Sequence, residues 1–413
     1  MNELEPLVGI DVGSSGVSVV VAVDEGDEVV IQGCGQARHD AARKGIISDL
    51  EEVAAAVRAA AEEAEAMSSL PVEQAVVGIG GTPIQGARAT ASVPVTGRNH
   101  TVSEEDQHRA LAACARVSIP PDYRVLDIVP CGFALDGQGG LARPLGMPGR
   151  RLDGSAYVLY THKTHADTVE QAVNHAGVAV SRLVHEALAA GDAVLLPDER
   201  DLGCLLLDVG YGSSEWALFS EGGVVAIGAT PVAGRVFTND IAVVLKTTTV
   251  AAEDVKRRFG GAPENEKIDG EALEVPSLGG EGVLVYPGRF AAEIVHERLR
   301  DLLVRVHRAL VEDGLEALPR AGLVLTGGGS LLEGMVELAQ EIFGVRVRAG
   351  APRSLAGLTE PVSGPEWSVA CGLVLSEHRR RHDQTALRQG GQAGVLAWIR
   401  HALGEFFELG GGT

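Results

Sequence analysis

The apolar residues of the chain follow two patterns. Some form short runs rich in β-branched residues, and others recur with helical spacing in longer segments rich in Ala and Leu. From Leu7 to Val23, two β-branched runs flank DVGSSG, which predicts a strand, a glycine turn and a second strand paired as a hairpin. Ser48 and Glu51 have capping-box spacing, so a helix is predicted to begin there. Further strands are predicted at Gln74–Ile79, Cys204–Asp208 and Gly322–Leu325.

The hairpin pattern occurs twice. GIDVGSSGVSVVVA near the N-terminus and LLDVGYGSSEWALF in the middle of the chain both place Asp-Val-Gly between two strand-like runs, with small hydroxyl residues in the turn. One such loop is as readily a plain β-turn as a ligand loop, but two in the same context indicate an internal duplication. We therefore predict an α/β fold with two duplicated halves around a cleft.

Two further segments modify this picture. After the strand that ends at Leu325, the glycines Gly327–Gly329 precede a helical pattern, for which Ser330 is the predicted N-cap and Glu333 its box partner. From about Ile84 to Thr161, short strands and scattered Pro and Gly surround one predicted helix, which indicates an inserted α+β subdomain.

The glycine loops suit a phosphate chain, because glycine lets many backbone donors approach it closely. Two facing hairpins would clamp the phosphates, with Asp11 and Asp208 holding Mg²⁺ through water, since Mg²⁺ dehydrates reluctantly. The third loop would suit the adenosine side, helped by a helix N-terminus. The predicted phosphate-binding set is Asp11, Gly13, Ser14, Ser15, Asp208, Gly210, Gly212 and Ser213.

Composition narrows the function classes. The 413 residues predict about two to four domains, and the formal net charge of −21 argues against nucleic acid as a partner. Five widely spaced cysteines without a CxxC argue against a disulfide framework or a zinc ribbon. The acidic N-terminus has no signal-peptide pattern, and no run approaches the ~20 apolar residues that span a bilayer, so a cytoplasmic protein is expected.

The C-terminal run VLAWIRHALGEFFEL follows a polar, Arg- and Gly-rich stretch predicted to be a linker over 381–394. Its apolar residues have helical spacing, which favours an amphipathic helix at an anionic membrane surface. The basic residues at 379–381 and Arg388 would add attraction to that surface. The alternative is a C-terminal helix docked on the body of the protein. The residues expected to enter the membrane are Leu396, Trp398, Ile399, Leu403, Phe406 and Phe407.

In order and spacing, these motifs resemble the actin-like ATPase superfamily and, within it, the FtsA family of bacterial cell-division proteins. DVGSSG and DVGYGSS look like its two phosphate motifs and TGGGSLLEG like its adenosine motif, and the insert and the tail are also FtsA features. The resemblance implies discontinuous domains: a first-half core of 1–83 with 162–194 and 361–380, an insert of 84–161, a second-half core of 195–234 with 315–360, a peripheral subdomain of 235–314, the linker 381–394 and a membrane helix of 395–413.

The resemblance also implies residue roles. Glu186 would orient the attacking water, although a structural Glu at a helix start is the alternative. Arg298 and Asp301 would bind the C-terminal tail of FtsZ, unless they only form a solvated helix face. Glu253 and Lys256 would contact ribose and adenine, unless they are a solvated i,i+3 pair. The full implied adenosine-binding set is Gly234, Glu253, Lys256, Gly327, Gly328, Gly329 and Ser330.

The chain departs from the FtsA pattern at Gly16, where many relatives have Lys, and at Tyr211 and Glu215, which replace the more usual Gly and Asp. We therefore expect ATP binding with slow or absent hydrolysis. The implied function is a self-associating protein that tethers the FtsZ ring to the cytoplasmic side of the cell membrane at the division septum, alongside other division proteins. The alternatives are a pilus-assembly ATP-binding scaffold and a phosphotransferase of the same superfold.

Overall fold

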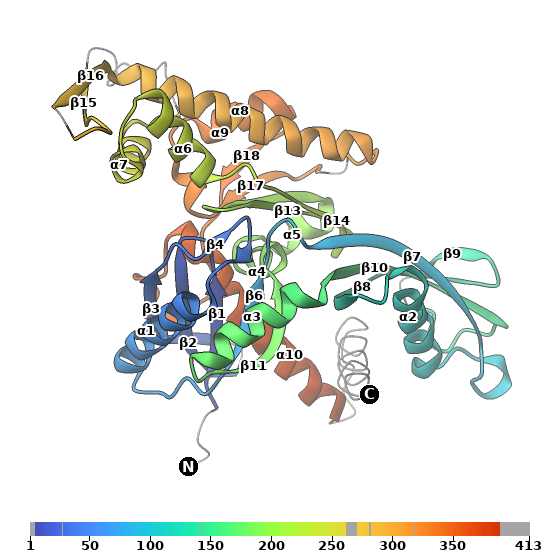
Figure 1. Cartoon of the computed structure of the whole chain (residues 1–413). Helices are drawn as coiled ribbons and strands as arrows, with labels where there is room; N and C mark the ends of the chain where they lie inside the picture. The colour runs from blue at the N-terminus through green and yellow to red at the C-terminus, as the bar shows by residue number, and fades with distance from the viewer. Residues whose placement is uncertain are drawn as a thin grey trace.

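The computed structural model describes residues 5–26, 28–141, 143–261, 271–280, 282–317 and 319–388. Two mixed sheets organise the molecule (Figure 1). The first has the strand order β11-β6-β1-β2-β3-β19. Its strands are β1 (Leu7–Val12), β2 (Gly16–Asp24), β3 (Val29–Arg38), β6 (Gln74–Ile79), β11 (Ala179–His185) and β19 (Ala356–Gly357).

The second sheet repeats the plan of the first, with the order β14-β13-β12-β17-β18. In each sheet three consecutive strands pair antiparallel, and a later strand pairs parallel with the first of the three. That later strand is β6 beside β1 in the first sheet and β17 beside β12 in the second. This repetition confirms the predicted duplication. The strands are β12 (Cys204–Val209), β13 (Ser214–Ser220), β14 (Gly223–Thr230), β17 (Gly322–Thr326) and β18 (Val347–Ala349).

Apolar helices cover the first sheet and connect the halves. The Ala-rich helix α1 buries one face against this sheet, and α4, which joins the halves, packs along α10. The long helix α10 (Ser368–Arg388) also packs on β1 and β2. The bounds of these helices are α1 (Leu50–Ser68), α3 (Lys163–His175) and α4 (Glu186–Val194). Two further helices pack against the second sheet: α5 (Pro197–Leu202) on β13 and α9 (Met335–Phe343) on β18.

Two outlying units extend the core. One is a separate sheet of order β7-β10-β8-β9 beside α2 (Glu104–Ser118), with its own apolar cluster; its strands are β7 (Gln85–Pro94), β8 (Tyr123–Leu135), β9 (Gln138–Leu141) and β10 (Arg151–His162). The other comprises α6 (Gly234–Val244), α7 (Thr249–Phe259), α8 (Gly288–Glu312), β15 (Ala272–Pro276) and β16 (Val283–Pro287). The short strands β4 (Ala42–Arg43) and β5 (Ile46–Ile47) form a small ribbon.

Two predicted helix caps were wrong. The cap of α1 is Asp49, whose carboxylate accepts the Glu52 amide, while the Ser48 hydroxyl donates to the Ala41 carbonyl instead. After the third glycine loop, residues Gly328–Leu331 form one 3-10 turn, and α9 begins only after Gly334. Both errors arise because a neighbouring backbone acceptor attracts the serine hydroxyl that would otherwise cap the helix.

The beginning of the predicted linker is helical, because α10 continues to Arg388. The arginines that looked like linker residues pair with acids: Arg380 and Arg381 contact Glu377 one turn earlier, and Arg379 contacts Asp192 (3.0 Å) on α4. The predicted membrane residues at 396–407 lie outside the described residues. Within the described part of the chain, none of the helices is both long enough and apolar enough to span a bilayer.

Candidate functional site

The two duplicated hairpins turn toward each other. In the first, Asp11 pairs with Ser18 across β1 and β2, and in the second Asp208 pairs with Glu215 across β12 and β13. Their turns touch, since a Cβ placed on Gly212 would lie 2.2 Å from the Ser14 hydroxyl oxygen. The two glycine loops therefore face each other as predicted, and the second loop has a glycine at the point of contact.

Two aspartates lie behind these turns, one from each half. Burial and, to a smaller extent, the charge of Asp208 raise the pKa of Asp11 to about 7, so the two carboxylates are electrostatic neighbours. Burial likewise raises the pKa of Asp208 to about 7. The sequence places these residues far apart, and the duplication brings them together.

Two glutamates complete an acidic cluster. Burial, together with the charges of Asp208 and Asp11, raises the pKa of Glu215 to about 8 although the Gly81 amide opposes this. The pKa of Glu186 is raised well above its ordinary value by burial and by Glu215. A hydrogen bond joins the two glutamates, and a Cβ on Gly80 would lie 2.2 Å from a Glu186 oxygen and 2.3 Å from a Glu215 oxygen. A side chain at Gly80 would therefore displace the carboxyl groups of the two glutamates.

Glu215 is held in place from three directions. The Gly81 amide donates to its Oε1, the Ser213 hydroxyl lies 3.5 Å from the same oxygen, and His185 Nε2 lies 3.7 Å from Oε2. Burial lowers the pKa of His185 to about 4, so this imidazole is neutral at physiological pH and does not neutralise Glu215. Oε2 of Glu215 is buried without a hydrogen-bond partner.

The chemistry of this donor set suits a divalent cation that is held through water. Four carboxyl groups with raised pKa values lie in this cluster (Asp11, Asp208, Glu186 and Glu215), and Glu215 is buried while the other three are partly buried. Their ionised forms are therefore disfavoured as they stand. A bound cation would favour the ionised forms, and a hard ion such as Mg²⁺ prefers carboxylate and water oxygens. The orphaned Glu215 oxygen is a further acceptor that such a site could use.

The predicted adenosine residues gather at the start of α6. Lys256 Nζ donates to the Gly234 carbonyl (3.2 Å), to the Thr238 hydroxyl (3.1 Å) and to Glu253 (2.7 Å). Lys256 is only 6% exposed, so the alternative of a solvated Glu253–Lys256 pair is wrong. The Gly234 amide donates to the Gly210 carbonyl (3.1 Å), which ties this cluster to the second hairpin.

The third glycine loop lies beside the second aspartate. A Cβ on Gly327 would lie 2.0 Å from an Asp208 oxygen, and the Ser330 hydroxyl donates to the Gly327 carbonyl (2.7 Å). The phosphate and adenosine segments predicted from separate motifs are thus linked through Asp208 and Gly210.

Arg298 and Asp301 lie elsewhere, on α8. Arg298 forms an ion pair with Asp240 of α6 and lies 3.6 Å from Asp301, which also accepts from Arg305 (2.7 Å). Neither residue is part of the acidic cluster. The network joins α8 to α6 on a face where the Arg298 side chain is 41% exposed, so the FtsZ-tail assignment stays a prediction beside the alternative of a solvated face.

The sequence motifs do not predict several parts of the site. Glu215 was noted only as a departure from a pattern, yet it belongs to the acidic cluster; its position opposite Asp208 in the hairpin was the available signal. Gly80 and Gly81, directly after a predicted strand, were passed over. Arg235 of α6 contacts Asp40 of the first half (3.0 Å), a pair that no spacing in the sequence indicates.

Comparison with known proteins decides the family. Residues 205–372 match the family model of cell division protein FtsA, and residues 81–160 match that of the SHS2 domain inserted in FtsA. The FtsA of Pseudomonas aeruginosa is 34% identical over 94% of this chain and 93% of its own length, and that of Bacillus subtilis is 32% identical over 91% and 84%. The chain belongs to the FtsA family. The predicted resemblance is confirmed.

Solved structures place this FtsA family member in the actin-like fold. A PilM–PilN type IV pilus biogenesis complex aligns over 90% of this chain and 98% of its own with a TM-score of 0.65 and 19% identity. MreB5 of Spiroplasma citri bound to AMPPNP aligns over 94% and 99% with a TM-score of 0.56 and 13% identity. At these identities the likeness shows the fold alone, so the resemblance to the pilus protein carries no pilus function.

Proposed function

We propose that this FtsA family member binds ATP with Mg²⁺ where the two hairpins meet. The acidic cluster between facing glycine turns is the observation that carries the proposal. The AMPPNP-bound MreB5, which has the same fold, supports it. The turn amides and the hydroxyls of Ser14, Ser15 and Ser213 would donate to the phosphates, and the Gly234–Lys256 cluster and the third glycine loop would face the nucleoside.

Within this site, Asp11 and Asp208 would hold Mg²⁺ through water, and the bound ion would neutralise phosphate charge. Glu186, which belongs to the same acidic cluster, would orient the attacking water. The departures from the FtsA pattern at Gly16, Tyr211 and Glu215 support slow or absent hydrolysis, with ATP acting as a conformational ligand.

The test is calorimetry of the full chain with ATP, with and without Mg²⁺. We expect saturable, Mg²⁺-dependent binding, a turnover below the ~1–10³ s⁻¹ of ordinary enzymes, and binding about tenfold or more weaker in Asp208→Asn. Asp198→Asn changes an exposed acid of the same half and should bind as the wild type does. Absence of binding heat in the wild type, or equal affinity in the two variants, would contradict the proposal.

We further propose that the chain is a peripheral protein on the cytoplasmic side of the cell membrane at the division septum, tethered through residues 395–413. Because Arg379, Arg380 and Arg381 already pair with Glu377 and Asp192, the apolar residues of the tail would supply most of the membrane affinity. A chain ended after Gly394 should lose co-sedimentation with anionic liposomes. Equal co-sedimentation of both forms would refute the tether.

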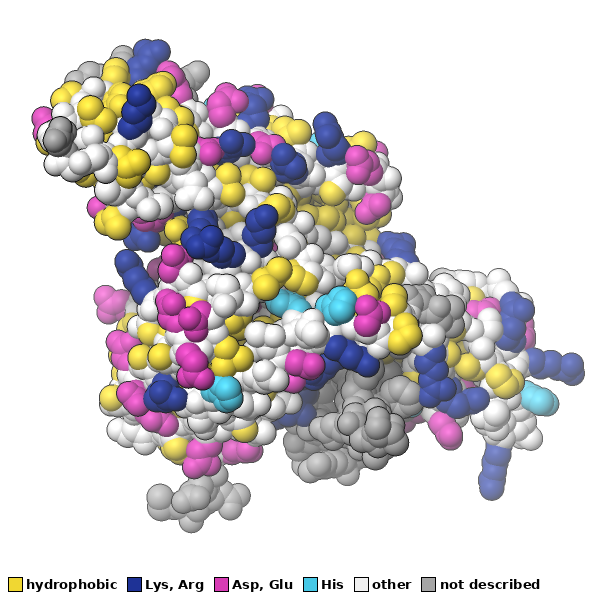
Figure 2. All heavy atoms as spheres, in the orientation of Figure 1, with side chains coloured by type: hydrophobic (Ala, Val, Ile, Leu, Met, Phe, Trp, Pro, Cys, Tyr) yellow, Lys and Arg dark blue, Asp and Glu magenta, His cyan; other side chains and the backbone are white. Residues whose placement is uncertain are grey.

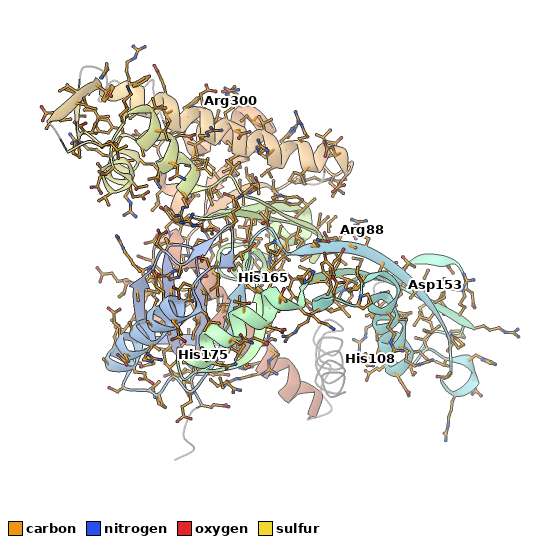
Figure 3. The ribbon with its side chains drawn as sticks, in the orientation of Figure 1. Arg88, His108, Asp153, His165, His175 and Arg300 are labelled. Atoms are coloured by element: carbon orange, nitrogen blue, oxygen red, sulfur yellow. The ribbon has the colours of Figure 1, made fainter. Side chains whose placement is uncertain are left out.

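The third proposal is that the α8 face recruits the acidic, apolar tail of FtsZ, and that nucleotide-dependent self-association into filaments organises the ring with other division proteins. Arg298 would exchange part of its contact with Asp240 for a peptide carboxylate. Arg298→Glu should abolish FtsZ pull-down. Arg300→Glu is the matched control: Arg300 lies on the same helix (Figure 3) and pairs with Glu341 of α9 (3.2 Å). Unchanged binding by Arg298→Glu would remove the assignment.

A further inference from the structure

Two histidines of α10 and one aspartate of β2 converge at the opposite end of α10 from the nucleotide site. His378 and His382 are one helical turn apart, so their side chains lie on the same face of the helix. Their rings are 4.2 Å apart between centroids. Asp24, the last residue of β2, faces both of them from the first sheet.

The distances among the three side chains match those of a tetrahedral metal site. His382 Nε2 lies 3.1 Å from Asp24 Oδ2, and His378 Nε2 lies 3.4 Å from Asp24 Oδ1. Each residue can offer one ligand atom such that all three atoms lie within 4.8 Å of one another. Zinc bound at its usual 2.0–2.1 Å separates its tetrahedral ligands by about 3.4 Å, so little movement is needed.

The surroundings already orient the carboxylate. The Gly26 amide donates to Asp24 Oδ1 (3.0 Å), and the hydrogen bonds from His382 and Gly26 lower the pKa of Asp24 although partial burial opposes them. His378 Nε2 also lies 3.0 Å from the Gly26 carbonyl, a contact that a metal would replace. The three side chains are partly exposed, at 25% for Asp24, 16% for His378 and 43% for His382, so an ion has access from solvent.

The chemistry of the donors selects the kind of ion. Two imidazole nitrogens and one carboxylate oxygen suit Zn²⁺ and similar transition metals, whereas Mg²⁺ and Ca²⁺ prefer sites made of oxygens only. The proposed Mg²⁺ site around Asp11 and Asp208 offers oxygen atoms only. The two places in the molecule would therefore prefer different metals.

We propose that Asp24, His378 and His382 form a binding site for a divalent transition metal of the zinc class, with water completing the coordination. The ion would fasten the C-terminal half of α10 to the turn between β2 and β3. This inference does not depend on the nucleotide site.

The experiment uses the tag-free full chain in excess Mg²⁺, which saturates oxygen-only sites, titrated with Co²⁺ and then Zn²⁺. We expect one equivalent of Co²⁺ with visible d–d absorption that Zn²⁺ displaces. His378→Ala/His382→Ala should lose affinity by more than the roughly 10–100-fold that even outer-shell partners contribute. Zn²⁺ should also raise the unfolding temperature of the wild type but not of this variant.

Two further variants keep the test decisive. His382→Gln changes only the most exposed ligand and should weaken binding while leaving circular dichroism unchanged. His175→Ala removes an exposed histidine of α3, 3.9 Å from Glu51, and should bind as the wild type does. Equal Co²⁺ affinity in the wild type and the double variant, or absorption that comes only from thiolate ligation, would overturn the proposal.

Discussion

A single carboxylate, Asp106, joins the start of α2 to the end of β7 in the inserted SHS2 domain. Its oxygens accept from the amide and hydroxyl of Thr96 (3.0 and 2.8 Å) and of Ser103 (3.0 and 2.8 Å), and Arg109 contacts it as well. The side chain is fully buried. These hydrogen bonds outweigh the effect of burial and hold the pKa of Asp106 far below its ordinary range.

We predict that Asp106→Asn destabilises the inserted domain by about 1–3 kcal/mol at neutral pH, because the amide cannot accept all of these bonds and leaves buried donors unpaired. The depressed pKa fixes the sign of the pH effect. The stabilisation is present above the ordinary Asp pKa of about 4 and is lost as the pH falls below it, so the gap between wild type and variant should narrow in acid.

Hydrogen exchange of residues 81–160 and thermal unfolding from pH 7 to pH 3 measure this effect. Glu105→Gln is the control, since Glu105 is an exposed neighbour on the same helical turn. A difference in stability between the wild type and Asp106→Asn that stays constant or increases on acidification would contradict the prediction.

At the scale of elements, the sequence predicts the paired hairpins because each carries its pattern within about fifteen residues, and β-branched runs around a glycine turn have few other solutions. The helix starts were off by one residue or more, because a serine hydroxyl chooses among nearby acceptors. The sequence predicts only part of the acidic cluster. Asp11 and Asp208 belong to local motifs, but Glu215 and Gly80 meet only through contacts between sheets, which no local spacing records.

The interface between the inserted domain and the second half is formed largely by β10 and β14. The Tyr157 hydroxyl accepts the amide of Ile227 (3.1 Å), and Arg88 of β7, labelled in Figure 3, donates to the Val225 carbonyl (3.5 Å). Tyr157 is buried at this interface, and β14 packs against both β7 and β8. The inserted domain is therefore attached to the second sheet by side chains that reach backbone groups of β14.

We predict that Tyr157→Phe costs about 1–3 kcal/mol, because it leaves the buried Ile227 amide without its acceptor. The loss should appear as faster hydrogen exchange of β14 and a lower unfolding temperature. Tyr160→Phe on the same strand is the matched control, since the Tyr160 ring packs edge-on against Tyr123 and phenylalanine keeps that packing. Equal effects of the two substitutions would show that the hydroxyl of Tyr157 does not stabilise this interface.

At the scale of the whole molecule, the two halves meet through a charged contact as well as through α4. Arg235 of α6 pairs with Asp40, which follows β3 (3.0 Å), and its guanidinium lies 5.9 Å from the centre of the Tyr211 ring. Figure 2 shows basic side chains gathered where the upper part of the molecule meets the lower part in that view. The pair spans the same junction as the proposed nucleotide site, so its strength should bear on how firmly the halves close.

We predict that Asp40→Arg weakens ATP binding about twofold to fivefold, because it replaces an exposed attraction of ~0.2–1 kcal/mol with a repulsion across the junction. The exchanged pair Asp40→Arg/Arg235→Asp should restore most of the affinity, since it restores the attraction with reversed polarity. Calorimetry of the wild type, both single variants and the double variant gives the coupling free energy directly. A double variant that binds ATP as weakly as Arg235→Asp alone would show instead that Arg235 contacts the nucleotide itself, because only a direct role in binding would survive repair of the ion pair.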